Sequence, residues 1–195
     1  MKRVGIYSGT FNPVHAGHIA FALQSVKKAN LDKVFFMPER YRPNKTDIAH
    51  FGHRVAMVRQ AIRPYNSFGL IENSDVSFSV EKTLPKLRNQ FFGASLVFLM
   101  GSDNLENIKN WPKVDTLLKY SELVVGIRAG DEPMVDQWIK ELPRQPKTMY
   151  LIKSYAPSVS STKIREALRS QQEADGLLSS VRRYSDSNWL YISLA

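Results

Sequence analysis

Two histidines stand three positions apart near the start of the chain, in the segment Gly9-Thr10-Phe11-Asn12-Pro13-Val14-His15-Ala16-Gly17-His18. An apolar run from Arg3 to Ser8 predicts a strand before this segment, and a helical pattern over residues 16–29 follows it. Unpaired amide groups at a helix start attract anions, and side chains three positions apart share one face of a helix. Histidine can donate a hydrogen bond or carry positive charge near neutral pH. The segment therefore predicts a site for a nucleotide phosphate, although a single histidine at a helix start is more often only a cap.

A second candidate phosphate site lies in the last quarter of the chain, where Ser158-Val159-Ser160-Ser161-Thr162 is followed by Lys163 and Arg165. Hydroxyls, backbone amides and a guanidinium in the first turn of a helix can bind a polyphosphate together. The alternative is an ordinary Ser/Thr N-cap, which is common at helix starts. The presence of both motifs in one chain favours phosphate binding.

Four further residues are candidates because they follow predicted strands or lie in the adjoining loops. Asp103 follows the strand predicted over residues 95–100 and could accept hydrogen bonds from ribose hydroxyls, or could cap the next helix. Trp111 could stack on an aromatic ring or belong to the core. Lys45 lies in a basic loop from which it could reach a phosphate, or it could be solvated. Arg128 follows a later strand and is expected at the same edge of the sheet.

Composition narrows the class of protein. The length of 195 residues predicts a single domain over residues 1–195, and the absence of cysteine excludes disulfides, thiol catalysis and zinc-thiolate sites. No apolar run is long enough to span a membrane and the first residues lack a signal-peptide pattern, so a cytoplasmic location is expected. The net charge of +9 fits nucleic acid or a small anionic substrate. The basic residues are spread along the chain, which makes polynucleotide binding unlikely.

The expected architecture is α/β, because apolar strand patterns alternate with helical patterns. Strands are predicted over residues 3–8, 34–37, 70–71, 95–100, 123–127 and 149–152, and helices over 16–29, 51–62, 80–90, 114–119, 134–141, 162–169 and 174–184. This order predicts a doubly wound, mainly parallel sheet with helices on both faces and a small C-terminal helical part. Ligands of such sheets bind at the carboxyl ends of the strands, where the candidate sites converge. Neither a Walker A motif nor Gly-x-Gly-x-x-Gly occurs.

These motifs resemble those of the nucleotidyltransferase superfamily with the His-x-Gly-His signature, and within it the bacterial nicotinate-mononucleotide adenylyltransferases. The segment 9–18 is similar to the family's first motif, and Ser160-Ser161-Thr162-x-x-Arg165 is similar to its second. Gly101-x-Asp103, Trp111 and Val125-x-x-Arg128-x-Gly130 are similar to further landmarks in the same order. The resemblance covers nearly the whole chain. It implies a Rossmann-like fold and transfer of the adenylyl group of ATP to nicotinate mononucleotide, with release of pyrophosphate, in NAD biosynthesis.

The resemblance also implies roles for individual residues. The implied catalytic residues are His15, His18 and Thr10, and the implied ATP and phosphate contacts are Gly9, Thr10, Phe11, His15, His18, Lys45, Ser160, Ser161, Thr162 and Arg165. The implied contacts of the acceptor nucleotide are Ser79, Val80, Asp103, Trp111 and Arg128. Mg²⁺ is expected to arrive with ATP, with no protein side chain holding a metal.

Four segments depart from the family pattern. Ser8-Gly9-Thr10 replaces Gly-Gly-Thr, Pro43-Asn44-Lys45 replaces Pro-His-Lys, Arg128-Ala129-Gly130 replaces Arg-Pro-Gly, and Phe78-Ser79-Val80 stands where Ser-Tyr-Thr lines the pyridine pocket. The acceptor therefore stays open between nicotinate mononucleotide, nicotinamide mononucleotide and another phosphorylated compound. A non-catalytic module that binds a nucleotide or nucleic acid is the alternative from another class. It fits the charge but gives no reason for both phosphate motifs to occur together. Homo-oligomer formation is left open by the sequence.

Overall fold

The computed structural model describes residues 2–40, 47–153 and 159–192. Within these ranges the elements are β1 (Arg3–Gly9), α1 (Ala16–Lys28), β2 (Lys33–Pro38), α2 (Phe51–Ile62), β3 (Phe68–Leu70), α3 (Thr83–Gln90), β4 (Ser95–Gly101), α4 (Ser102–Ile108), α5 (Val114–Tyr120), β5 (Glu122–Ile127), α6 (Glu132–Lys140), β6 (Met149–Lys153), α7 (Ser161–Arg169) and α8 (Ser179–Ser187). The strands form one six-stranded sheet in the order β3-β2-β1-β4-β5-β6, with every neighbouring pair parallel. This is the strand order of a doubly wound Rossmann-like sheet, so the predicted fold class is confirmed.

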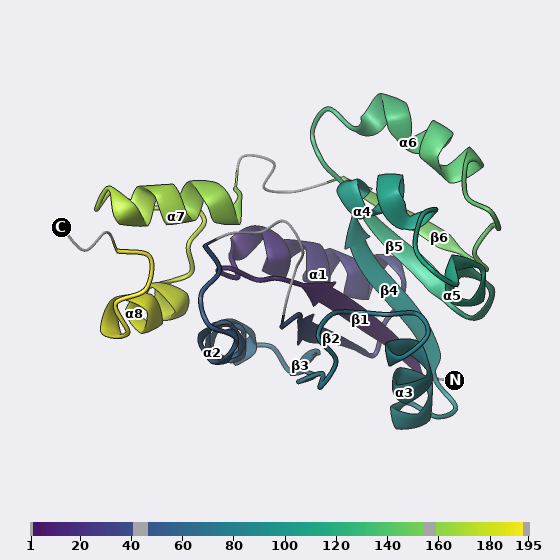
Figure 1. The fold of residues 1–195 in the computed structure, drawn as a ribbon, viewed down its shortest axis with the longest axis horizontal. Helices are drawn as coiled ribbons and strands as arrows, with labels where there is room; N and C mark the ends of the chain where they lie inside the picture. The colour runs from purple at the N-terminus through teal and green to yellow at the C-terminus, as the bar shows by residue number, and fades with distance from the viewer. Residues whose placement is uncertain (1, 41–46, 154–158, 193–195) are drawn as a thin grey trace.

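Both faces of the sheet are buried, which explains why its central strands are apolar almost without interruption. In β4, Leu96, Phe98 and Met100 face one core cluster, whereas Val97 and Leu99 face the other. The first cluster includes side chains from α3, α4, α5 and α6, and the second includes side chains from α1, α2 and α8. Figure 1 shows these helices on the two sides of the sheet. The alternation of side chains along each strand is what lets one strand contribute to both clusters.

The C-terminal helices pack beside the α2 end of the molecule (Figure 1). Val181 of α8 is fully buried in the second core cluster. The hydroxyl of Tyr184 lies 3.0 Å from Nδ1 of His53, a residue of α2. The predicted small helical part is therefore packed against the sheet-covering helix α2, and α7 is held near the carboxyl ends of the strands.

Several predicted boundaries were displaced. β3 ends at Leu70 where a strand was expected over 70–71, and α4 was not predicted at all. α3 begins at Thr83 because the hydroxyl of Thr83 accepts a hydrogen bond from the Ser79 N–H, which holds the preceding residues in a turn. α8 begins five residues after the predicted start, because Gly176 takes a left-handed conformation (φ 74°). Across the described ranges, no helix has the length and apolar character needed to cross a membrane.

Candidate active site

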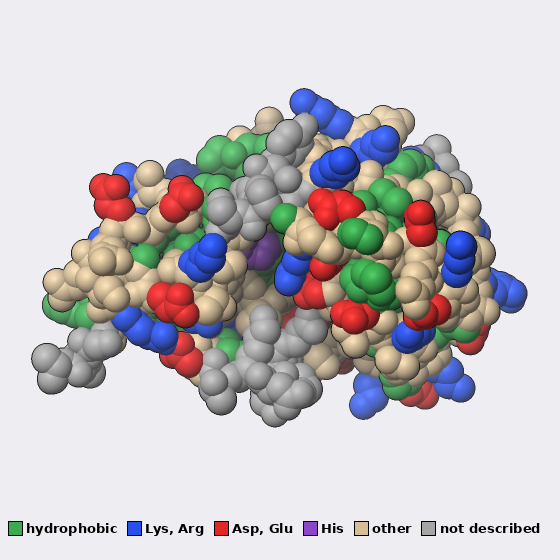
Figure 2. Space-filling view, turned by 90° about the horizontal axis from the view of Figure 1, so that it is seen from above, with side chains coloured by type: hydrophobic (Ala, Val, Ile, Leu, Met, Phe, Trp, Pro, Cys, Tyr) green, Lys and Arg blue, Asp and Glu red, His purple; other side chains and the backbone are tan. Residues whose placement is uncertain are grey.

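A cavity of about 770 Å³ lies at the carboxyl ends of β1, β4 and β5 and at the N-terminal ends of α1 and α7. Figure 2 looks onto this hollow, in which histidine is visible between the part that carries α7 and α8 and the part that carries α4 and α6. The strand order of the sheet reverses between β1 and β4, and ligands of doubly wound sheets bind at that crevice. The fold therefore brings the two phosphate motifs to the place where a nucleotide is expected.

Most of the predicted site residues line this one cavity. They are Gly9, Thr10, Phe11, His15, His18, Asp103, Arg128, Ser160, Ser161, Thr162 and Arg165. Tyr7 and Phe21 line it as well and were not predicted, and Asn12 of the first motif lines it without having been given a role of its own. Lys45 lies outside the described residues, so the structure gives no information on its role.

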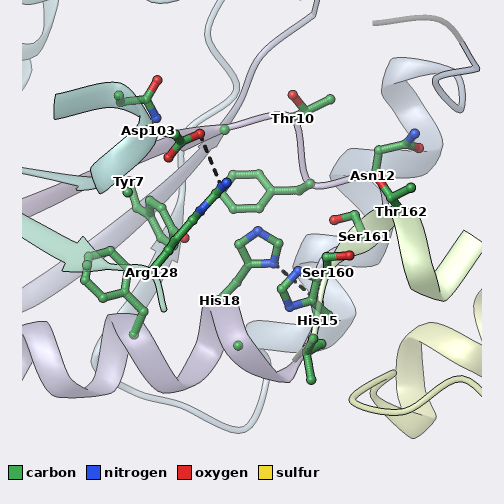
Figure 3. Close-up of a pocket in the computed structure, with 18 of the residues that line it drawn as sticks. Tyr7, Thr10, Asn12, His15, His18, Asp103, Arg128, Ser160, Ser161 and Thr162 are labelled. Carbon is green, nitrogen blue, oxygen red and sulfur yellow. Dashed lines mark hydrogen bonds and ion pairs between the residues drawn. The ribbon is translucent and has the colours of Figure 1, made fainter. Parts of the chain in front are cut away.

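The two histidines are stacked on each other at the start of α1, with ring centroids 3.7 Å apart. The His15 backbone N–H donates to Nδ1 of His18 at 3.2 Å (Figure 3). Because Nδ1 of His18 accepts this bond, a neutral His18 carries its proton on Nε2. His18 is thereby fixed as a hydrogen-bond donor at the edge of the cavity.

His15 differs from His18 in its electrostatics. It is buried, and desolvation together with the nearby Arg128 lowers its pKa to about 4. It is therefore neutral at pH 7 without a ligand. Nδ1 of His15 is buried and has no hydrogen-bond partner among the described residues. A buried polar atom without a partner is costly, which fits an atom that meets a ligand.

The second phosphate motif is joined directly to the first. The Ser161 hydroxyl donates to the Pro13 carbonyl at 3.0 Å, and Nη1 of Arg165 donates to the Asn12 carbonyl at 2.9 Å. Ser160 caps α7 by accepting a hydrogen bond from the Lys163 N–H at 3.2 Å. The predicted N-cap is therefore present, and the hydrogen bonds of Ser161 and Arg165 hold the start of α7 at the cavity. Phosphate binding there stays a prediction.

Asn12 ties the first motif to two distant segments. Its side-chain amide donates to the Asp47 carbonyl at 3.0 Å, and its Oδ1 accepts from the Ala49 N–H at 3.1 Å. The Tyr191 hydroxyl donates to the same Oδ1 at 2.7 Å. The carboxylate of Asp47 pairs in turn with Arg165 and Arg169. Asn12 therefore connects the phosphate turn to the loop before α2 and to the last described residues.

At the opposite end of the cavity, Asp103 and Arg128 form an ion pair with Oδ2 and Nη2 3.2 Å apart (Figure 3). Oδ1 of Asp103 is buried and has no hydrogen-bond partner among the described residues, so it can accept from a ligand hydroxyl. A Cβ at Gly101 would collide with the Asp103 carboxylate. Ser102 supports this end, because its hydroxyl accepts from the Arg128 N–H at 3.0 Å and donates to Asp131 at 2.5 Å.

Three predicted acceptor contacts do not line the cavity. Val80 is buried in the first core cluster, and the Ser79 hydroxyl accepts from the Lys82 N–H at 3.3 Å in the turn before α3. Trp111 packs against the same cluster, with its ring 5.9 Å from that of Phe78. Trp111 and the 78–80 segment do lie next to each other, as expected of two parts of one pocket wall. Their contact with an acceptor base stays a prediction.

Sequence reasoning assigned no role to Arg54 of α2, although His53-Arg54-x-x-Met57 is similar to a landmark of the family. Its guanidinium is fully buried and donates to the carbonyls of Thr10, Ala49 and Arg40. The signal was present, because Arg54 falls on the side of the helix that also carries the buried Val58 and would be unusual there as a solvated charge.

No group of three or more His, Asp or Glu side chains in the described part of the chain could hold a metal ion. Asp103 is the single carboxylate among the described residues that line the cavity, and it is already paired with Arg128. A metal ion at this site would therefore need most of its ligands from a bound molecule, as Mg²⁺ does when it binds nucleotide phosphates.

Comparison with known proteins agrees with this geometry. A family model described as cytidylyltransferase-like matches residues 6–167, which places the chain among the nucleotidyltransferases. A nicotinate-nucleotide adenylyltransferase of Bacillus subtilis strain 168 is 33% identical over 202 residues, covering 99% of this chain and 100% of the relative. A probable nicotinate-nucleotide adenylyltransferase of Clostridium perfringens strain SM101 is 36% identical over 181 residues, covering 89% of each chain. The chain therefore belongs to the nicotinate-nucleotide adenylyltransferase family.

Solved structures agree at the level of the fold. The Plasmodium falciparum nicotinic acid mononucleotide adenylyltransferase complexed with NaAD superimposes with a TM-score of 0.81 at 20% sequence identity, over 100% of both chains. The same protein complexed with APC gives a TM-score of 0.79 at 18% identity. At this level of sequence identity, the superposition shows that the two proteins share a fold.

Proposed function

We propose that this protein joins the adenylyl group of ATP to the phosphate of nicotinate mononucleotide and releases pyrophosphate. The observation that carries the proposal is the convergence of the two histidines and the Ser160–Arg165 motif at one end of the cavity. The other end carries a carboxylate and a guanidinium that can hold a second nucleotide. Membership of the adenylyltransferase family supports the same reaction.

The start of α7 would bind the β- and γ-phosphates of ATP. Amide groups at a helix N-terminus point at an anion, and the hydroxyls of Ser161 and Thr162 line the cavity beside them. Arg165 adds a guanidinium, which binds phosphate through paired hydrogen bonds. Its existing contacts with Asn12 and Asp47 hold this side chain at the cavity before ATP arrives.

The chemical step would be an in-line displacement at the α-phosphorus of ATP. An oxygen of the acceptor phosphate forms the new bond to phosphorus, the bond to the bridging oxygen breaks, and pyrophosphate leaves with the electron pair. His18, with its proton on Nε2, would donate to the oxygens on which negative charge develops. His15 is neutral without ligand, and the negative charge of the triphosphate would raise its pKa. Positioning and electrostatic stabilisation would carry the rate, with no covalent enzyme intermediate.

Mg²⁺ would enter with ATP and neutralise part of the phosphate charge. The described residues fit this arrangement, because the cavity offers phosphate-binding amides, hydroxyls and one guanidinium near α7 and only one carboxylate. Thr10 and Gly9 would lie next to the phosphates, since both line the cavity at the end of β1. The metal would thus bind to substrate oxygens, and the chain would bind the phosphates around it.

Asp103 would accept hydrogen bonds from ribose hydroxyls through its unpartnered Oδ1. Arg128, at the same end, could pair with a negative group of the acceptor. The roles of Ser79, Val80 and Trp111 toward the pyridine ring remain part of the proposal, as does the role of Lys45. The single domain and the cytoplasmic location also remain predictions.

The test is to incubate the protein with Mg-ATP and nicotinate mononucleotide and to measure both pyrophosphate and the dinucleotide product. Both products should form in equal amounts and neither should form when one substrate is left out. ATP binding without product from nicotinate mononucleotide, nicotinamide mononucleotide or other phosphorylated acceptors would support the non-catalytic alternative. A steep salt dependence of polynucleotide binding would support that alternative further.

A further inference from the structure

Arg54 is a charged side chain placed behind the phosphate turn and away from solvent. It is 1% exposed, it does not line the cavity, and it ranks among the largest fully buried side chains of the protein. Burial lowers its pKa, whereas the nearby Tyr191 and Glu39 raise it. Arginine stays protonated in proteins because its ordinary pKa lies above 12. A positive charge is therefore held inside the protein close to the proposed phosphate site.

The shortest hydrogen bond of Arg54 is with the backbone of the phosphate turn. Nη1 of Arg54 donates to the Thr10 carbonyl at 2.7 Å, while Nε donates to the Ala49 carbonyl at 2.9 Å and Nη2 to the Arg40 carbonyl at 3.1 Å. Through the last two bonds Arg54 also holds Arg40 and Ala49, which lie before and after residues 41–46 in the sequence. Carbonyl oxygens satisfy the donors of Arg54 without cancelling its net charge.

Because the Thr10 carbonyl and the Phe11 N–H belong to one planar peptide bond, the hydrogen bond from Arg54 also orients the Phe11 N–H. The Thr10–Phe11 peptide is trans, so its C=O and N–H point in opposite directions. With the Thr10 carbonyl directed at the buried Arg54, the Phe11 N–H is directed away from Arg54. Thr10 and Phe11 both line the cavity, and Phe11 adopts a positive φ of 49°, which is uncommon for a residue with a side chain. The hydrogen bond from Arg54 supports this conformation.

The neighbouring carbonyls of the turn are held outward in the same way. The Gly9 carbonyl accepts from the Glu39 N–H at 2.9 Å, the Asn12 carbonyl from Arg165, and the Pro13 carbonyl from Ser161. Carbonyl oxygens repel phosphate, and backbone amides attract it. Donors outside the turn thus hold the carbonyls of Gly9, Thr10, Asn12 and Pro13, and Arg54 is the one among these donors that is buried and charged.

We propose that Arg54 is a positioning residue for the triphosphate: it orients and polarises the Thr10–Phe11 peptide so that the Phe11 amide binds a phosphate oxygen. The inference rests on the proposed function, because it requires the triphosphate of ATP to lie against this turn. It adds a residue outside the cavity to the phosphate-binding apparatus. It also explains why an arginine stands on the buried side of α2.

The test compares binding of ATP with binding of uncharged adenosine by titration calorimetry, for the wild type and for Arg54→Met. The Met57→Ala variant is the matched control, because Met57 is a fully buried residue of the same helix that makes no hydrogen bond to the turn. Arg54→Met should weaken ATP binding roughly 10- to 100-fold, the range of a lost charge-assisted hydrogen bond, and change adenosine binding less than about threefold. Met57→Ala should lower the melting temperature and leave both affinities within about twofold. Equal losses for ATP and adenosine, or an unchanged affinity for ATP, would overturn the proposal.

Two further measurements decide the question if Arg54→Met does not fold. Arg54→Lys keeps the charge and Arg54→Gln keeps only hydrogen-bonding capacity, so the lysine variant should bind ATP at least about fivefold more tightly than the glutamine variant. In the wild type, inorganic triphosphate should shift the Phe11 amide resonance downfield in NMR spectra. Equal affinities of the two variants, or an unmoved Phe11 resonance, would overturn the role of Arg54 while leaving ATP binding intact. Failure of the wild type to bind ATP would instead overturn the proposed function itself.

Discussion

The two ends of the cavity differ in how their side chains are held. At the phosphate end, the turn over residues 9–13 is fastened by α2, by α7 and by Tyr191 through the hydrogen bonds of Arg54, Ser161, Arg165 and Asn12. At the acceptor end, Asp103 and Arg128 are about half exposed or more and are held mainly by their mutual ion pair. A phosphate can thus be bound by groups already in place, whereas the second nucleotide meets side chains that can rearrange.

The two ends of the cavity should therefore have separate tasks: one end acts on the triphosphate, and the other recognises the acceptor. The phosphate end combines helix starts and backbone amides with the side chains of His15, His18 and Arg165, and these groups can bind any triphosphate. The predicted acceptor contacts are side chains, and three of them lie outside the cavity: Val80 and Trp111 lie in or against the first core cluster, and Ser79 lies in the turn before α3. Changes at the phosphate end should therefore affect the rate and the binding of ATP, and changes at the acceptor end should affect the second substrate.

The largest effect is expected for His18→Ala. Loss of a donor that meets developing charge should lower kcat about 100- to 1,000-fold and leave the melting temperature nearly unchanged. His50→Ala is the matched control, because His50 is exposed and only caps α2. Steady-state measurement of pyrophosphate release would check both variants, and near-normal turnover of His18→Ala would remove His18 from the proposed mechanism.

A large effect of pH on stability is expected from His15. The pKa of its side chain falls from 6.5 in the unfolded chain to about 4 in the folded protein, because the folded state desolvates the ring. Between these pH values the unfolded state binds a proton that the folded state does not. Acidification from pH 6.5 to pH 4 should therefore lower the free energy of unfolding by up to about 3 kcal/mol through this group.

Denaturant unfolding of the wild type and of His15→Gln at several pH values would measure this contribution. The difference between the two proteins isolates His15 from the carboxylates, which also titrate at low pH. The free energy of unfolding of the variant should fall less than that of the wild type over this range. Parallel curves for the two proteins would show that the folded protein does not desolvate His15 as described.

Arg165→Ala should act on ATP alone. Removal of the guanidinium should raise the KM for ATP about 10- to 100-fold and change the KM for the acceptor less than about threefold. Arg182→Ala, which removes an exposed arginine paired with Asp186 on α8, is the matched control. An equal rise of both KM values would contradict the division of the cavity into two ends.

Asp103→Asn should have a smaller effect than Arg165→Ala, and this effect should fall on the acceptor and not on ATP. It weakens the ion pair with Arg128 and replaces a carboxylate oxygen that is free to accept from a ribose hydroxyl. The KM for the acceptor should rise about tenfold with little change in the KM for ATP. Asp115→Asn, on α5 away from the cavity lining, serves as the control. A loss of affinity for ATP with unchanged affinity for the acceptor would show that Asp103 contacts ATP, which would contradict its proposed role.

The sequence predicted what is local and missed what depends on packing. The strand patterns and the helix starts at His15 and Ser160 follow from the spacing of apolar, glycine and hydroxyl residues, and the structure brings both helix starts to one cavity. The spacing along α2 places Arg54 on the buried side of the helix, but the three carbonyls that it contacts could not be derived in the same way. Whether a charged residue on a helix is solvated or buried depends on which carbonyls the rest of the chain places around it.

The acceptor end was harder to predict for the same reason. Arg128 directly follows β5 and Asp103 lies two residues after β4, so their place at the sheet edge could be predicted. Ser79, Val80 and Trp111 belong to loops and turns whose direction is set by packing on the core, such as the contact of Trp111 with Phe78. The start of α3 was misplaced in this segment too, because the hydrogen bond from the Ser79 N–H to Thr83 favours a turn.

The most direct measurement is the ratio of kcat/KM for nicotinate mononucleotide to that for nicotinamide mononucleotide, with Mg-ATP saturating and pyrophosphate release as the signal. The account predicts a strong preference for the nicotinate form, in spite of the Phe78-Ser79-Val80 segment. Equal rates with the two acceptors, or release with neither by a protein that binds ATP, would contradict the proposed acceptor and leave only the phosphate end of the account standing.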